Sequence, residues 1–306
     1  MNDQLEGRPV LITGGLGFIG AALCDRLKRD GATIHTASRR PAPPGAPGRH
    51  WQLDLSDAAA VATLVRDVRA EYVFHLASHV TGSHDLKHVL PAFRGNLQST
   101  VNLLTELQAV GCRRMVTTGS LVEPEGNSRG IPSSPYAAAK WASSDYVRMF
   151  HAVYGFPAAI ARVFMVYGPG QQDVSKLVPY VIHSLLRGED PEITSGTRLI
   201  DWIYVDDVVE GLVRLAVSPD LDGRSIDLGS GSAVTIRELV EKIYAFMEIG
   251  AAPMFGALRD RPLEPFRIAN IAETRRLIGW APGVSLDAGL RRTIEWYRQR
   301  FDARSS

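Results

Sequence analysis

The sequence predicts an α/β protein built on a doubly wound parallel sheet. Short apolar runs alternate with helical patterns over the first 166 of 306 residues, and such alternation is typical of parallel strands joined by crossover helices. A glycine-rich turn separates the first apolar run from the first helical pattern, which fixes where the first strand ends. The expected strands are residues 9–13, 32–38, 50–53, 72–76, 114–118 and 158–166.

The glycine turn after the first strand has the form of a dinucleotide-binding loop. Gly14 can take the strained backbone of the turn, Gly17 lets the main chain approach a pyrophosphate, and Gly20 permits close packing of helix on strand. The helix N-terminus adds free N–H groups and a partial positive charge. The strand and helix around the turn favour this function over an ordinary turn. A Rossmann unit is therefore expected, with cofactor contacts from Gly14, Gly17, Phe18, Ile19 and Gly20.

The end of the second strand bears on the identity of the cofactor. An acidic residue there would accept hydrogen bonds from a ribose 2′-hydroxyl, whereas an arginine would meet a 2′-phosphate. This chain has Ser38-Arg39-Arg40 and no carboxylate in that turn. The sequence thus favours NADP(H) over NAD(H), although two solvated arginines in a surface loop remain an open alternative, and NAD(H) remains possible.

A second motif lies in mid-chain, where Tyr136 and Lys140 are four residues apart in a helical pattern and share one face. Tyrosine has an ordinary pKa near 10. The ammonium of Lys140, about 4 Å away, would stabilise the phenolate of Tyr136 by roughly 4 kcal/mol at an effective dielectric near 20. This would lower the pKa of Tyr136 toward neutrality by about three units. Ser120 follows an apolar strand and would hydrogen-bond the same substrate oxygen. We expect Ser120, Tyr136 and Lys140 to form a catalytic group that moves a proton at a hydroxyl or carbonyl.

With these motifs the chain resembles the extended short-chain dehydrogenase/reductase family, the NAD-dependent epimerase/dehydratase group that modifies nucleotide sugars. The likeness covers nearly the whole length. It also includes Leu53-Asp54-Leu55, His75-Leu76-Ala77-Ser78, Asn96, Arg162-Val163-Phe164, Tyr167-Gly168-Pro169-Gly170, residues 201–208 and residues 261–265. The resemblance implies further cofactor contacts from Asp54, Leu55, Leu76, Ala77, Ser78, Asn96, Tyr136 and Lys140.

The resemblance also implies two closely joined subdomains. A Rossmann domain is expected over residues 1–166, with a return segment at about 200–228. A smaller C-terminal substrate-binding lobe is expected over 167–199 and 229–306. Helical patterns at 176–187, 235–247 and 285–300 fit that lobe.

Departures from the family pattern exclude some of the reactions that the family catalyses. The 4,6-dehydratases of the family place Asp-Glu straight after the catalytic Ser or Thr, because eliminating water needs an acid and a base. Here those residues are Leu121 and Val122, and Glu123 would reach the site only through an unusual loop. The decarboxylase pattern, a glutamate two residues after the catalytic Ser or Thr, is also missing.

Hydride transfer at a secondary alcohol or ketone remains. The favoured function is NADPH-dependent reduction of a nucleotide-linked 4-keto-6-deoxy sugar. The alternative is a nucleotide-sugar 4-epimerase, and the second alternative is a non-catalytic dinucleotide-binding protein, since a fold does not imply a function.

Substrate contacts are inherited mainly from the resemblance. Many relatives carry an Asn and an Arg that contact the diphosphate where this chain has Met165 and Ile200. Nearby cations are candidates to meet phosphate charge, although Arg198 and Lys176 could equally be solvated surface residues. The expected substrate-binding residues are His79, Glu123, Met165, Lys176, Arg198 and Arg261.

Composition limits partners and location. The balance of 34 basic and 33 acidic residues gives a formal charge of +1, so no electrostatic footprint for nucleic acid is present. Two cysteines, Cys24 and Cys112, are too few for a disulfide framework and lack metal spacing, so no metal site is expected. No apolar run approaches the ~18 residues of a membrane span, and a strand that begins by Pro9 leaves no room for a leader. A cytoplasmic protein without a membrane partner is expected.

By resemblance, the helices around 90–109 and 134–153 would form a four-helix contact in a homodimer. The apolar positions of the second helix could equally pack against the protein's own sheet; they are Trp141, Tyr146, Val147, Phe150 and Val153.

Overall fold

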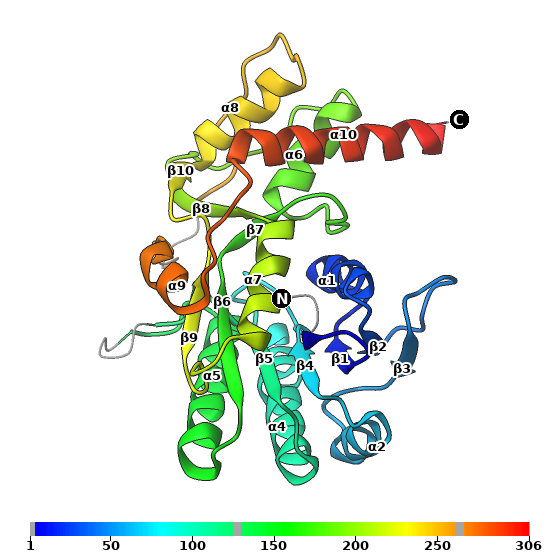
Figure 1. Ribbon diagram of the computed structural model, residues 1–306. Helices are drawn as coiled ribbons and strands as arrows, with labels where there is room; N and C mark the ends of the chain where they lie inside the picture. The colour runs from blue at the N-terminus through cyan, green and yellow to red at the C-terminus, as the bar shows by residue number, and fades with distance from the viewer. Residues whose placement is uncertain (1–3, 125–129, 261–265, 306) are drawn as a thin grey trace.

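The computed structural model describes residues 4–124, 130–260 and 266–305. Its centre is a parallel sheet of seven strands in the order β3-β2-β1-β4-β5-β6-β9 (Figure 1). The predicted doubly wound α/β fold is therefore confirmed. The strands are β1 (Pro9–Thr13), β2 (Thr33–Ser38), β3 (Arg49–Gln52), β4 (Tyr72–His75), β5 (Arg114–Ser120), β6 (Ala158–Val163) and β9 (Ser225–Leu228).

Helices cover both faces of this sheet because successive strand residues point to opposite sides. In β1, Val10 and Ile12 enter the core formed with α1 and α7, whereas Leu11 enters the core formed with α2, α4 and α5. The order of the strands reverses between β1 and β4, so the chain crosses in opposite directions there. Ligands of open α/β sheets bind at the carboxyl ends of the strands beside such a switch. The covering helices are α1 (Phe18–Arg29), α2 (Ala58–Val68), α4 (Ser99–Val110), α5 (Pro135–Tyr154) and α7 (Val205–Val217).

The start of α5 is fixed by its own residues. The hydroxyl of Ser134 accepts a hydrogen bond from the N–H of Ala137 at 3.2 Å, and Pro135 occupies the first helical position, where its missing N–H costs nothing. Tyr136 thus lies in the first turn and Lys140 one turn further along the same face.

Between β4 and α4 the chain forms short turns of different pitch. They are η2 (Leu86–His88), α3 (Val89–Ala92) and the π-helical η3 (Phe93–Gln98). Of these turns, α3 and η3 pack beside α5, and η3 carries Asn96 back to the end of β4.

A second, smaller body lies at the top of Figure 1. A three-stranded sheet in the order β10-β8-β7 forms its floor, and α6, α8 and α10 pack on it through an apolar core that includes Trp202 and Leu239. Its elements are β7 (Met165–Tyr167), α6 (Leu177–Leu186), β8 (Leu199–Tyr204), β10 (Ala233–Thr235), α8 (Ile236–Phe246) and α10 (Leu286–Ser305).

The division between the two bodies differs from the predicted boundaries in two places. β8 pairs with β7 and β10, so the return to the large sheet begins with α7 instead of at about residue 200. Farther on, α9 (Ile271–Ile278) packs against β9, and Ala269, Ile278 and Trp280 join the core around α7. The segment from 269 to 280 therefore belongs with the large sheet, although the predicted lobe included it.

Asp201 links the two bodies. It is 1% exposed, and its carboxylate accepts hydrogen bonds from the N–H groups of Ser230 at 2.6 Å, Gly231 at 3.0 Å and Ala269 at 3.0 Å. These bonds hold the end of β9 and the segment before α9 against β8. Within the ranges described above, no helix has both the length and the apolar character needed to cross a membrane.

Candidate active site

The glycine loop closes tightly against the segment that follows β4. Gly14 has φ +71°, and a Cβ added to it would lie 2.8 Å from the backbone nitrogen of Ala77. The predicted cofactor residues Gly14, Leu76 and Ala77 are therefore brought together at the switch between β1 and β4. α1 begins after Gly17, a residue without a side chain, so the first N–H groups of the helix are left for a ligand. This cradle fits the pyrophosphate of a dinucleotide.

The turn after β2 lies beside this loop, because the N–H of Gly14 donates to the carbonyl oxygen of Ala37 at 2.8 Å. Ser38 donates its hydroxyl proton to the carbonyl oxygen of Arg40 at 2.9 Å. Hydrogen bonds from Ser56 lower the pKa of Asp54, and the charges of Arg39 and Arg94 lower it further. Arg39 thus interacts electrostatically with the carboxylate of Asp54, which follows β3. Leu55, beside it, is buried.

Asn96 holds the chain after β4 in place. It is 1% exposed, and its Oδ1 accepts from the hydroxyl of Ser78 at 2.8 Å and from the N–H of His79 at 2.7 Å. Its Nδ2 donates to the carbonyl oxygen of His79 at 3.2 Å. Asn96 was predicted to contact the cofactor, and the structure gives its buried amide Ser78 and His79 as hydrogen-bond partners.

The predicted catalytic residues meet at the end of β5. The hydroxyl of Tyr136 lies close enough to the side chains of Ser120 and Ser78 for both to lower its pKa, so Ser78 adds a third hydroxyl to the predicted cluster. Lys140 is buried, and its Nζ donates to the carbonyl oxygen of Thr118 at 2.8 Å and to Oγ1 of Thr118 at 3.1 Å. The hydroxyls of Ser78, Ser120 and Tyr136 thus lie together, and the ammonium of Lys140 is held nearby on Thr118 of β5.

The protonation of this cluster differs from the prediction. Burial raises the pKa of Tyr136 to about 12, and the charge of Glu123 adds to the increase. Burial also lowers the pKa of Lys140 to about 8, against an opposing effect of Glu123. The predicted fall of the Tyr136 pKa toward neutrality is therefore not found in the protein alone, because desolvation of the phenolate is the largest cause and acts in the opposite direction. At neutral pH Tyr136 is a phenol, ready to donate a proton.

Glu123 was predicted as a substrate contact, and the structure corrects this. The side chain turns inward from the loop after β5 and is 4% exposed. Its Oε1 accepts from the N–H of Ser120 at 2.6 Å and its Oε2 accepts from the hydroxyl of Ser144 at 2.8 Å. The carboxylate therefore lies behind Ser120 and does not face a substrate. Ser144 was not predicted, although its position four residues after Lys140 places it on the same helix face.

The other predicted substrate residues are spread over both bodies. His79 follows Ser78, and its Nε2 lies 3.2 Å from Nδ1 of His88, while burial lowers its pKa. Met165 begins β7, Lys176 precedes α6 with its Nζ 3.9 Å from Oδ2 of Asp173, and Arg198 precedes β8. Arg261 lies outside the described residues.

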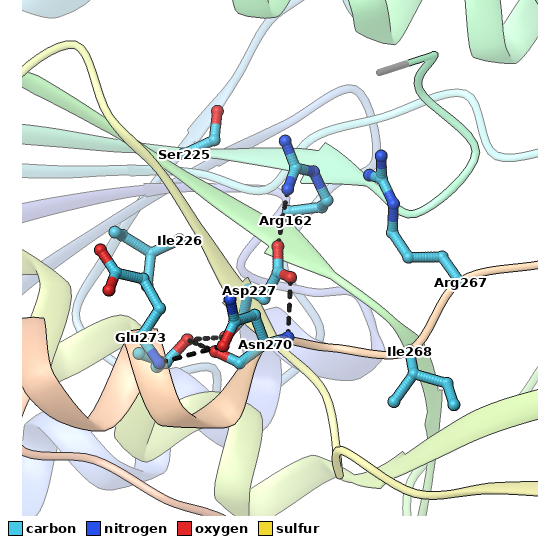
Figure 2. Close-up of a pocket in the computed structure, with 9 residues that line it drawn as sticks. Arg162, Ser225, Ile226, Asp227, Arg267, Ile268, Asn270 and Glu273 are labelled. Carbon is cyan, nitrogen blue, oxygen red and sulfur yellow. Dashed lines mark hydrogen bonds and ion pairs between the residues drawn. The ribbon is translucent and has the colours of Figure 1, made fainter. Parts of the chain in front are cut away.

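A separate cavity of about 290 Å³ lies between β6, β9 and α9 (Figure 2). Arg162 donates to Oδ1 of Asp227 at 2.7 Å there, and Oδ2 of Asp227 accepts from the N–H of Asn270 at 3.0 Å. The described residues that line it include none of those predicted as site residues. Arg162 is nevertheless the register partner of Gly119, one residue before Ser120, so its charge lies near the catalytic strand.

A glycine cradle at the switch point of a parallel sheet, with Ser120, Tyr136 and Lys140 beside it, defines the class of Rossmann-fold enzymes that use a dinucleotide for hydride transfer. The chain belongs to the NAD dependent epimerase/dehydratase family, whose model matches residues 10–229. The predicted resemblance is thereby confirmed.

Two curated relatives match along nearly the whole chain. The UDP-glucose 4-epimerase of Mycolicibacterium smegmatis is 29% identical, over 95% of this chain and 98% of its own. The dTDP-glucose 4,6-dehydratase of Neisseria gonorrhoeae is 28% identical, over 96% of this chain and 97% of its own. The relatives thus include both nucleotide-sugar epimerases and dehydratases.

Two solved structures match the fold along nearly the whole chain. An epimerase from Methanothermobacter thermautotrophicus superposes with a TM-score of 0.89 at 27% identity, covering 100% of this chain and 96% of its own. The Bordetella bronchiseptica enzyme WbmF, in complex with NAD+ and UDP, superposes with a TM-score of 0.84 at 26% identity. The match covers 98% of this chain and 95% of the WbmF chain.

Proposed function

We propose that the protein is an NAD(H)-dependent epimerase that inverts carbon 4 of a nucleotide sugar. The observation that carries the proposal is the hydroxyl cluster of Ser78, Ser120 and Tyr136, beside which the described residues that follow Ser120 place no free carboxylate. Of the three residues after Ser120, Leu121 is a buried apolar residue, Val122 is apolar, and Glu123 is buried and hydrogen-bonded. Elimination of water needs an acid and a base at the sugar, so among the activities of the relatives epimerisation is favoured over dehydration.

The residues divide the work of such a reaction. Tyr136 exchanges a proton with the oxygen on carbon 4, and Ser120 hydrogen-bonds that oxygen as its charge changes. Lys140 supplies the positive charge that favours the phenolate when Tyr136 acts as the base. A nicotinamide ring, when bound, supplies reversible hydride acceptance at the same carbon. Asn96 keeps Ser78 and His79 in place through the hydrogen bonds described above.

The assay that tests this proposal begins with the purified protein and no added dinucleotide. A panel of UDP-hexoses and UDP-uronic acids is incubated with it, because WbmF was crystallised with UDP and the mycobacterial relative acts on UDP-glucose. We expect inversion at carbon 4, observed by proton NMR, with no net change in nicotinamide absorbance. The dinucleotide released on denaturation is expected to be NAD+ or NADH, identified by mass spectrometry.

A second candidate is the NADPH-dependent ketoreductase favoured by the sequence. Ser38-Arg39-Arg40 supports it, since this turn offers no carboxylate for a ribose 2′-hydroxyl. Stoichiometric oxidation of added NADPH by a nucleotide-linked 4-keto-6-deoxy sugar, with no inversion of any UDP-sugar, would replace the epimerase proposal with this one.

We also propose that the protein is a homodimer. Large apolar side chains are exposed on the adjoining surfaces of α3, η3 and α5, where isolated apolar residues are common but a group on one face indicates an interface. The group consists of Leu90, Phe93, Tyr146, Val153 and Tyr154. Such a face fits a second copy of itself, in the isologous manner of most dimers.

The dimer can be tested by charge insertion. Phe93→Glu places a carboxylate on the proposed face, and burying an unpaired charge there would cost several kcal/mol. We expect light scattering to give about twice 33.4 kDa for the wild type and 33.4 kDa for the variant. Met254→Glu, at an exposed apolar residue far from this face in sequence, is the control and should leave the mass unchanged. A wild-type mass of 33.4 kDa contradicts the proposal.

A further inference from the structure

Glu123 is a buried acid directly behind the catalytic hydroxyls. Taking a carboxylate out of water costs several kcal/mol unless hydrogen bonds and opposite charges compensate for it. Both of its oxygens are used, one by the N–H of Ser120 and the other by the hydroxyl of Ser144. The side chain therefore joins the end of β5 to α5 at the level of the active site.

The first contact fixes the turn that carries Ser120. The N–H of Glu123 donates to the carbonyl oxygen of Ser120 at 3.1 Å, while the N–H of Ser120 donates back to Oε1 at 2.6 Å. This reciprocal pair closes a four-residue turn. Gly119 makes room for it, since a Cβ there would lie 2.7 Å from Oε1. The position of the Ser120 hydroxyl thus depends on a side chain three residues away.

Among the described residues, three ionisable groups interact electrostatically with this carboxylate. α5 contributes Tyr136 and Lys140, and β6 contributes Arg162. The charge of Arg162 is already offset by its ion pair with Asp227 (Figure 2). The ammonium of Lys140, in contrast, is hydrogen-bonded to the uncharged oxygens of Thr118. Glu123 is thus the carboxylate that balances Lys140 across the catalytic cluster.

We propose that Glu123 is a positioning residue that holds the Ser120 turn and supplies the counter-charge keeping Lys140 an ammonium and Tyr136 a phenol. The catalytic part of this proposal rests on the proposed function, but the electrostatic part does not. Removing the charge of Glu123 should shift the pKa values of Lys140 and Tyr136 in one direction. Because the carboxylate raises the pKa of both Lys140 and Tyr136, its loss lowers both.

The first test measures Lys140 without any substrate. Glu123→Gln keeps an oxygen that can accept from Ser120 and removes the charge. The chain has five lysines, so ε-13C-lysine labelling gives a simple NMR titration, with Lys140 assigned from its loss in Lys140→Arg. We expect the Lys140 midpoint to fall by about one pH unit in the variant. An unchanged midpoint overturns the electrostatic part.

The second test follows turnover against pH. In Glu123→Gln both limbs of the kcat profile should move to lower pH by about one unit, with little change in KM. A lower kcat with unmoved limbs would indicate a merely structural role and overturn the proposal. Ser144→Ala removes one hydrogen bond and keeps the charge, so its limbs should stay where the wild type has them. Glu241→Gln, an exposed glutamate on α8, is the matched control.

Two outcomes are kept apart by this design. A wild type that inverts no nucleotide sugar contradicts the proposed function, while the lysine titration still decides whether Glu123 balances Lys140. Where Glu123→Gln folds poorly, Glu123→Met removes the same charge in an apolar side chain of similar size, and the same fall in the Lys140 midpoint is expected. An unchanged midpoint in that variant overturns the inference in turn.

Discussion

Tyr136→Phe should reduce kcat by roughly 10²- to 10⁴-fold, the usual contribution of a positioned acid or base. The change removes the hydroxyl that meets Ser120 and Ser78 and leaves the ring in the first turn of α5. Folding should be only modestly affected, since a buried hydrogen bond contributes about 1 kcal/mol net. Steady-state kinetics on the substrate identified by the sugar panel, together with a thermal unfolding curve, provide the measurement.

Tyr154→Phe is the matched control, because this tyrosine lies at the other end of the same helix and is exposed. It should keep wild-type kcat. If Tyr136→Phe also kept wild-type turnover, Tyr136 would not be the proton-transfer group. The non-catalytic alternative, a dinucleotide-binding protein, would then regain support.

Gly20→Ala should largely abolish dinucleotide binding. A Cβ at this position would collide with the carbonyl oxygen of Gly14 and lie 2.8 Å from Cα of Gly15, so α1 would be forced away from the loop. Overpacking of this kind typically costs about 1–3 kcal/mol of stability, and the displaced N–H groups would no longer converge on a phosphate. Calorimetric titration with NAD+ and with NADP+ should show at least a tenfold loss of affinity.

Gly250→Ala provides the comparison for that experiment. A Cβ on Gly250 would meet no described heavy atom within 4 Å, so dinucleotide affinity and unfolding temperature should stay close to those of the wild type. Equal affinity in Gly20→Ala and the wild type would mean that the cofactor does not bind at the start of α1.

The parts of the site that the sequence predicted are those set by local geometry. Helical spacing places Tyr136 and Lys140 on one face, and a strand that ends at Ser120 brings it to the same edge of the sheet. The same spacing would also have found Ser144. Ser78 was predicted as a cofactor contact, but its place beside the phenol depends on Asn96, which a π-helical turn carries back to it.

What the sequence could not predict depends on burial. The inward turn of Glu123 is decided by backbone angles after β5, and the protonation of Tyr136 by how far its hydroxyl is removed from water. Charge spacing alone suggested the opposite direction for its pKa. The choice between NADP(H) and NAD(H) also stays a prediction, since the solved neighbour WbmF holds NAD+ while the turn at Ser38-Arg39-Arg40 contains no carboxylate.

The exchange of segments between the two bodies has a consequence for how the chain can be divided. The large sheet is completed only when α7, β9 and the segment 269–280 return from the smaller body, and Asp201 ties that return to β8. A fragment ending at residue 166 would expose the face of β5 and β6 on which α7 packs. The lobe is therefore not a detachable module. Recombination between relatives would have to exchange it as interleaved pieces instead of joining two halves at a single crossover.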